Sequence, residues 1–232
     1  MIQEAEAYFQ KSRESYRAGD LKASLAALDK AITIDPNNHE YYMARGDLRY
    51  MLDEYGPSIE DFTKVIDDSQ DLDELAEAHS KMLVVYHYWS GHTNEVIEEL
   101  NWIIAHGFGR SNDFSWRGLH MLRLGLIENA ISDYSAAYEL ASSNDYLLGR
   151  AHAFYAAQYY EKAIDDLTLI LDKKDPLHPS ILAAIYHWRA KAYRKLNIKE
   201  NALSDANQEM LLRNQEPFST FDEYITKTGG DE

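Results

Sequence analysis

The sequence predicts an all-α fold of stacked helical hairpins, and three observations support this. An eighteen-residue pattern at 45–62, RGDLRYMLDEYGPSIEDF, returns at 117–134 as RGLHMLRLGLIENAISDY. Small side chains recur in phase within the copies of this pattern. Only five prolines occur in 232 residues, and an interior proline costs a helix about 3 kcal/mol. Because one amphipathic hairpin cannot bury its apolar face alone, repetition of the unit predicts that the hairpins stack.

The same pattern occurs six times along the chain. Two further clear copies lie at 150–167 and 189–206, and looser copies lie at 11–28 and 83–100, so that the six starts are 34, 38, 34, 33 and 39 residues apart. We expect one domain over 1–232, with repeats of about 34 residues at approximately 5–38, 39–72, 77–110, 111–144, 144–177 and 183–213.

Small residues recur at two positions of each copy, and a small side chain lets two helix backbones approach closely. The first position holds Ser12, Gly46, Val84, Gly118, Ala151 and Ala190, and the second holds Ser24, Ser58, Val96, Ala130, Ala163 and Ala202. The third copy departs from the rule, since it has valine at both places. The turn between the helices contains Gly19, Gly91 or Gly125 in three copies, each a suitable left-handed position after the first helix.

These in-phase positions, together with the ending AITIDPNN of the first copy, resemble the tetratricopeptide repeat family over nearly the whole chain. The resemblance implies two antiparallel helices, A and B, in each repeat. It implies a right-handed superhelical α-solenoid of about six helix-turn-helix repeats. A short capping helix is expected at 218–229, where Thr220 and Glu223 form a capping box and Gly229 ends the helix.

An arginine and an aspartate recur together in four of the six repeats. The pairs are Arg45 with Asp61, Arg117 with Asp133, Arg150 with Asp166 and Arg189 with Asp205. The first and third repeats lack both residues. Because each arginine occurs only with an aspartate in its own repeat, we expect a structural ion pair between helices A and B. Three over-length segments, including IDDSQDLDELAE and DKKDPLHPS, are predicted to be longer loops between repeats.

Composition excludes several classes of function. The chain has no cysteine, which excludes thiol catalysis, zinc–thiolate sites and disulfides. Its net charge is −16, and residues 1–75 hold 17 acidic against 8 basic residues, so nucleic acid is not an expected partner. No apolar stretch approaches 18 residues and the N-terminus has no apolar signal-peptide core, so we expect no membrane span and a cytoplasmic protein.

In the resembled family, the concave surface is lined by A helices and holds peptides. Carried over by position, the resemblance predicts a partner-binding groove formed by Phe9, Arg13, Tyr16, Met43, Tyr50, Lys81, Tyr88, Trp89, Leu122, Arg123, Tyr155, His187, Lys191 and Arg194. Four tyrosines recur at one position of this set, and such rings are favoured at recognition surfaces. Three interpretations stay open: the rings contact a partner, they are buried between neighbouring A helices, or they mediate self-association.

Basic residues gather in the sixth repeat, where Lys191, Arg194 and Lys195 are expected to point into the groove beside His187. That end fits an acidic segment or a chain-terminal carboxylate, and a solvated terminal face is the alternative. The lysine and asparagine that clamp a carboxylate in some family members are replaced by Phe9 and Arg13.

No catalytic or metal-binding motif is present. The nine histidines form no HExxH or i, i+4 pair on a predicted helix, and no Walker loop, GxGxxG or GxSxG occurs. We therefore predict a non-catalytic scaffold without cofactor or metal, which binds a protein or peptide partner. The alternatives are an acidic, immunity-type inhibitor that masks a basic partner surface, and a structural homo-oligomer.

Overall fold

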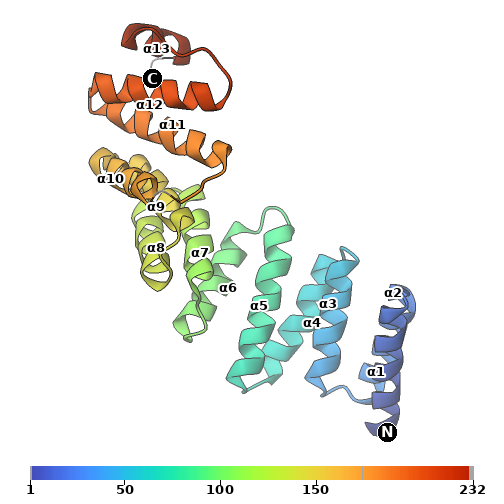
Figure 1. Cartoon of the computed structure of the whole chain (residues 1–232). Coiled ribbons are helices and arrows are strands. Elements are labelled where there is room, and N and C mark those ends of the chain that lie inside the picture. The colour runs from blue at the N-terminus through green and yellow to red at the C-terminus, as the bar shows by residue number, and fades with distance from the viewer. Residues whose placement is uncertain (1, 174, 230–232) are drawn as a thin grey trace. The chain divides into compact units, whose positions relative to one another are not determined.

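The computed structural model describes residues 2–173 and 175–229. These residues form helices and turns, and none of them forms a strand (Figure 1). The all-α fold is thus confirmed. The odd-numbered helices up to α11 are the A helices, the even-numbered ones up to α12 are the B helices, and α13 follows them. The helices are α1 Ile2–Arg17, α2 Leu21–Ile34, α3 His39–Met51, α4 Tyr55–Asp68, α5 Leu72–Tyr88, α6 Thr93–Ala105, α7 Ser111–Arg123, α8 Ile127–Leu140, α9 Asn144–Ala156, α10 Tyr160–Asp172, α11 Pro179–Lys195, α12 Lys199–Leu212 and α13 Phe221–Thr228.

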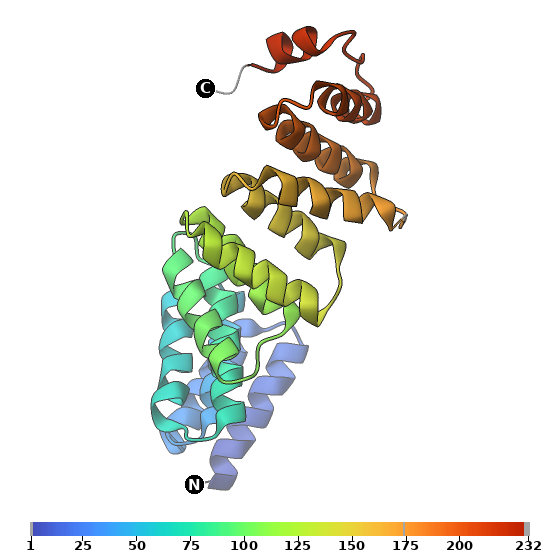
Figure 2. The same cartoon turned by 90° about the vertical axis from the view of Figure 1, so that its left-hand side faces the viewer.

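The contacts divide the chain into two compact units. The N-terminal unit is residues 1–109 with α1–α6, and the C-terminal unit is residues 110–232 with α7–α13. Within each unit, every B helix packs on the A helix before it, and every B helix except α6 also packs on the helix after it. In the C-terminal unit this succession runs from α11 to α12 and then to α13 (Figure 2).

Every A helix is followed by one residue with a left-handed backbone, at the same place in each repeat. These residues are Gly19, Asp53, Gly91, Gly125, Gln158 and Asn197, with φ between 58° and 94°. In five of the six turns, the next N–H bonds back to the last turn of the helix, as Leu126 does to the Met121 carbonyl at 2.9 Å. The left-handed conformation costs a non-glycine residue roughly 1–2 kcal/mol. The three non-glycine turns therefore show that helix packing, more than glycine, determines this geometry.

Several hydrogen bonds between neighbouring A helices join residues that are 34 or 35 positions apart. Lys81 Nζ lies 2.7 Å from Asp47 Oδ2, and Tyr146 Oη donates to Asn112 Oδ1 at 2.6 Å. The last helix obeys the same spacing, because Arg194 Nη1 donates to Thr228 Oγ1 at 3.2 Å. The contacts thus reproduce the period of the sequence, and α13 occupies the place that the A helix of a seventh repeat would take.

The predicted arginine–aspartate pairs are all present, and each is bidentate. Arg150 donates from Nε and Nη2 to the two carboxylate oxygens of Asp166, at 2.8 Å each. The aspartates are buried. Burial raises the pKa of Asp61, and the neighbouring Arg45 and Arg49 offset part of this increase. The equivalent pairs are Arg45–Asp61, Arg117–Asp133 and Arg189–Asp205.

In the first, second and fourth repeats, the A helix crosses its B helix at the small residues, whereas Val84 of the third repeat is exposed. A methyl group added to Gly46 would lie 2.5 Å from Phe62 Cε1, too close for any real contact. In the first repeat the crossing is formed by two serines, since Ser12 Oγ and Ser24 Oγ are 2.8 Å apart. The small-residue rule therefore reflects direct contact between the two helices.

The third repeat replaces the arginine–aspartate pair with a different one. Glu99, at the aspartate position, is buried and its Oε2 lies 2.6 Å from His79 Nδ1. The His79 ring stacks on Trp102 with centroids 3.9 Å apart. The sequence did not predict this pair, because His79 lies four residues before the position that arginine holds elsewhere.

All three over-length segments were expected to be loops. For IDDSQDLDELAE and DKKDPLHPS, this expectation is wrong in part. In both cases the following A helix is longer: α5 and α11 have 17 residues each, whereas α3, α7 and α9 have 13. Asp71 caps α5 by accepting from the N–H groups of Asp73 and Glu74. The acidic residues at this helix start are favoured by the helix dipole.

The C-terminal cap is confirmed as α13. Thr220 Oγ1 accepts from the Glu223 N–H at 3.2 Å, and Glu223 Oε2 accepts from the N–H of Ser219, one residue before the expected one, at 2.7 Å. Tyr224 is buried against the end of the C-terminal unit, with Phe221 and Ile225 beside it. Gly229 ends the helix with a φ of 75°.

His152 of α9 lies inside the C-terminal unit, against Trp188 of α11, with ring centroids 4.6 Å apart. Its Nε2 atom is buried and has no hydrogen-bond partner among the described residues. Burial, and to a smaller extent His187, lowers the pKa of His152 from 6.5 to about 4. The imidazole is therefore neutral at pH 7 and packs as part of the core.

We predict that Asp166→Ala lowers the free energy of unfolding by about 3 kcal/mol, because it leaves the Arg150 guanidinium partly buried without its carboxylate. Urea unfolding measures the change. The control is Asp165→Ala, because Asp165 is adjacent in sequence but exposed, and its removal should cost less than about 0.5 kcal/mol. Equal losses from both variants would show that the pair does not hold the hairpin.

We also predict that the chain is less stable at pH 5 than at pH 7 through His152. The unfolded chain takes up this proton first, so the contribution is full above pH 6.5 and is lost as the pH falls to about 4. The loss at pH 5 is about 2 kcal/mol. The pKa values of Glu74 and Glu209 are lowered from 4.5. Protonation of those two carboxylates therefore lowers the stability at a lower pH than protonation of His152 does. Urea unfolding of the wild type and of His152→Gln at both pH values tests this, and equal pH dependence in the two proteins would contradict it.

Candidate functional site

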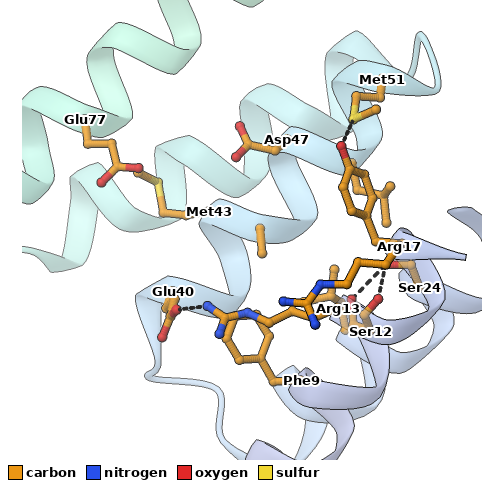
Figure 3. A pocket seen from close by; sticks show the side chains of 14 residues that line it. Phe9, Ser12, Arg13, Arg17, Ser24, Glu40, Met43, Asp47, Met51 and Glu77 are labelled. Carbon is orange, nitrogen blue, oxygen red and sulfur yellow. Dashed lines mark hydrogen bonds and ion pairs between the residues drawn. The ribbon is translucent and has the colours of Figure 1, made fainter. Parts of the chain in front are cut away.

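A pocket of about 510 Å³ lies between α1 and α3 in the N-terminal unit (Figure 3). Its floor is made of buried residues, among them Ser12, Leu28 and Leu48. Ser12 of α1 and Ala44 of α3 are among the small residues that line it. Its volume lies in the range of natural ligand pockets, roughly 300–1,000 Å³.

Two contacts between α1 and α3 border this pocket. Arg13 Nη2 and Glu40 Oε1 form an ion pair at 2.9 Å, and Tyr16 Oη donates to Met51 Sδ at 3.6 Å (Figure 3). Arg13 also covers the Phe9 ring at 4.4 Å from its centroid. These bordering side chains are exposed, so a ligand can displace them at small cost, since surface ion pairs contribute about 0–1 kcal/mol.

The hollow continues from α3 towards α5. A second pocket of about 350 Å³ shares Asp47 and Glu77 with the first and is also lined by Tyr50, Lys81 and Val85. Lys81 Nζ lies 2.7 Å from Asp47 and 3.5 Å from Glu77. The two pockets together place polar, charged and apolar side chains along the A helices of the N-terminal unit.

The structure brings the predicted residues of the first two repeats together, but in different roles. Phe9 and Met43 are only 3% and 7% exposed and belong to the core, where they form the deep wall of the first pocket. Tyr16 and Tyr88 are 48% and 63% exposed. Tyr50 is partly buried, with burial raising its pKa. The recurrent tyrosines are thus neither all buried nor all exposed.

Trp89 was expected on helix A, and this placement is wrong. Trp89 is the residue after α5 and has an extended backbone, with φ −82° and ψ 99°. Its ring lies 6.1 Å from that of Tyr55 and 4.1 Å from that of His92. The backbone at the turn of the third repeat thus directs the Trp89 ring towards α4.

In the C-terminal unit, the predicted residues lie on α7, α9 and α11. Leu122 is partly buried against Ala130, Tyr134 and Ala153, whereas Arg123 is exposed. The Tyr155 ring meets that of Trp188 edge to face at 5.3 Å. Lys191 Nζ lies over both rings, 5.5 Å and 4.8 Å from their centroids.

The basic end of the sixth repeat is engaged by the chain itself. His187 Nδ1 lies 3.0 Å from Glu209 Oε2, and despite burial this contact lowers the pKa of Glu209. Arg194 donates to Thr228 Oγ1 and lies 5.6 Å over the Tyr224 ring. The small hollow there, about 190 Å³, is lined by these residues and by Lys191.

Sequence reasoning missed several residues of the first pocket. Glu40 and Glu77 line it, although Glu40 occupies a groove position of the second repeat that could have identified it. Arg17 and Ser24 also line it; the sequence marks Ser24 as a recurrent small residue but not as part of a binding site.

Across residues 2–173 and 175–229, no group of three or more His, Asp and Glu side chains is placed to hold a metal ion. None of the described helices is both long and apolar enough to cross a membrane. Three His–Glu contacts, at His39, His79 and His187, each join two helices.

One segment of the chain matches a family model, and the fold matches solved structures. A family model described as tetratricopeptide repeat matches residues 5–38. No curated protein matches the chain. The crystal structure of YrrB, described as a TPR protein with an unusual peptide-binding site, is similar with a TM-score of 0.68 at 15% identity, over 88% of this chain and 98% of YrrB.

Two further crystal structures are similar. A tetratricopeptide repeat protein from Parabacteroides merdae ATCC 43184 has a TM-score of 0.65 at 16% identity, over 97% of this chain and 88% of that one. MamA has a TM-score of 0.59 at 19% identity, over 77% of this chain and all of MamA. Such repeats generally mediate protein–protein interaction. Residues 5–38 thus match the tetratricopeptide repeat in sequence, and the chain shares the fold of solved tetratricopeptide repeat structures.

Proposed function

We propose that the chain is a non-catalytic scaffold that holds a segment of a partner protein along the A helices of its N-terminal unit. The observation that carries this proposal is the pocket between α1 and α3, because it combines a buried apolar floor with an exposed polar border. A deep apolar side chain of the partner would fill the floor, and such anchors supply most of the affinity at protein interfaces. The polar border would fix the direction of the segment.

The charges around the two pockets support a segment with mixed polarity. Arg13, Arg17 and Lys81 are balanced there by the carboxylates of Glu40, Asp47 and Glu77. Four of these six groups already pair across helices. Since the rim has both signs of charge, it would select a partner by the order of its charges rather than by net charge.

The cytoplasmic location, the predicted groove of the C-terminal unit and homo-oligomerisation remain predictions. The acidic inhibitor is a second candidate function, and one observation favours it: residues 50–109 hold 13 acidic residues against Lys64 and Lys81. Complex formation that weakens steeply with salt would support this candidate over an apolar groove, because charge steering is screened.

The proposal predicts that peptides selected from a random displayed library on the full chain bind about tenfold or more weakly to Tyr16→Ala. Tyr16 contacts Met51 across the pocket border and is 48% exposed, so its loss removes ligand contact without opening the core. Dissociation constants measured by fluorescence anisotropy give the ratio, and tenfold corresponds to about 1.4 kcal/mol.

Tyr159→Ala is the matched control, because Tyr159 is also exposed but lies in the C-terminal unit. This variant should bind the selected peptides as the wild type does. Selection that yields no peptides, or equal affinity for both variants, would contradict the proposed pocket.

A further inference from the structure

Four aromatic rings form a continuous patch where α3 and α5 end. This aromatic cluster consists of Tyr50, Tyr55, Tyr88 and Trp89. The Tyr50 ring lies 5.9 Å from Tyr88 and 6.1 Å from Tyr55, and Tyr55 lies 6.1 Å from Trp89. Tyr88 is 63% exposed and the other three are partly buried. The cluster is therefore accessible over a large part of its surface.

The unusual turn of the third repeat creates this cluster. In all five of the other repeats, the residue equivalent to Trp89 is the last residue of the A helix. Trp89 instead leaves the helix with an extended backbone. Its ring then lies against Gly56, where an added Cβ would be 3.9 Å away. A local departure from the repeat has thus placed a tryptophan beside the tyrosines of the second repeat.

Elsewhere in the chain, basic side chains cover aromatic rings. Arg150 lies 5.5 Å from the centroid of Tyr138, and Lys191 lies 4.8 Å from that of Trp188. Among the described residues, no arginine or lysine lies over any of the four rings of the aromatic cluster. Rings covered in this way are Phe9, Tyr8, Tyr42, Phe114, Tyr138, Phe154, Tyr159, Tyr186, Tyr193, Tyr155, Trp188, Tyr224 and Phe221.

The charge around the cluster favours a cation. Lys64 and Lys81 are the basic residues of 50–109, and both are engaged, Lys64 with Asp68 at 2.6 Å and Lys81 with Asp47. Asp53 lies at the edge of the cluster, where its Oδ1 accepts from Tyr55 Oη at 2.9 Å. This hydrogen bond raises the pKa of the Tyr55 hydroxyl and holds the carboxyl group of Asp53 next to the rings.

We propose that the aromatic cluster binds an arginine or lysine side chain from a basic segment of a partner protein. The inference rests on the proposed function, because it specifies the chemistry of one part of the partner. A cation over the face of a tyrosine or tryptophan is attracted by the ring quadrupole, and arginine is found there more often than lysine. The acidic surroundings steer a basic segment to this face, while the rings give it a fixed place to dock.

An NMR titration of the full chain tests this inference. The probe is the peptide acetyl-Gly-Gly-Arg-Gly-Gly-amide, and the matched probe has glutamine in place of arginine. The arginine peptide should shift the Tyr88 and Trp89 ring signals in a saturable manner, and the glutamine peptide should bind about threefold or more weakly. Tyr88→Leu should weaken arginine-peptide binding by about three- to tenfold, because it keeps the apolar area but removes the ring.

Two controls separate ring recognition from general attraction to an acidic protein. Tyr88→Phe keeps the π face and should bind within about twofold of the wild type, and so should Tyr159→Leu, whose ring is already under Lys162 at 5.1 Å. Circular dichroism of each variant verifies that the fold is kept. Equal binding of the two probes, or unchanged binding by Tyr88→Leu, would overturn the inference.

A second copy of the chain is the competing occupant. Shifts of the same ring signals on dilution of the chain alone would identify it and would overturn a separate basic partner. The titration does not depend on the α1–α3 pocket. Its failure is therefore distinguishable from failure of the library selection that tests the proposed function.

Discussion

The structure depends on one constraint: a hairpin of two amphipathic helices has more apolar surface than it can bury by itself. Short helices are marginal in water without tertiary packing, so each hairpin needs the next. Several hydrogen bonds between neighbouring A helices join residues that are 34 or 35 positions apart, as at Tyr146 and Asn112. The same left-handed turn after all six A helices, and the repeated arginine–aspartate pair in four hairpins, keep each unit in register with its neighbours.

The repeats that depart from the common packing pattern also carry different side chains on their surfaces. The third repeat has valine at both crossing positions, a His79–Glu99 pair and an altered turn. These departures coincide with the most acidic part of the sequence and with the aromatic cluster. The first repeat also lacks the arginine–aspartate pair, and the α1–α3 pocket lies beside it. The candidate binding features of the N-terminal unit thus lie next to the two repeats that depart from the common pattern.

The sequence predicted the repeating features well because they depend on local, periodic contacts. Arg150 and Asp166 recur in phase, so their pairing could be inferred without coordinates. His79 and Glu99 could not be paired in this way, since the histidine lies on another turn of the helix. The candidate site was predicted less well. Whether Phe9 is core and Tyr88 is surface depends on how far adjacent A helices separate, and the backbone that moves Trp89 off α5 has no counterpart in the other repeats.

Comparing the stability of one hairpin with that of three tests the central claim most directly. Circular dichroism and urea unfolding of fragments 1–38 and 1–109 would give the helicity per residue of each. We expect fragment 1–38 to be largely unfolded and fragment 1–109 to be helical and to unfold cooperatively, because stacking stabilises repeats. Equal helicity and equal urea midpoints in the two fragments would contradict the account.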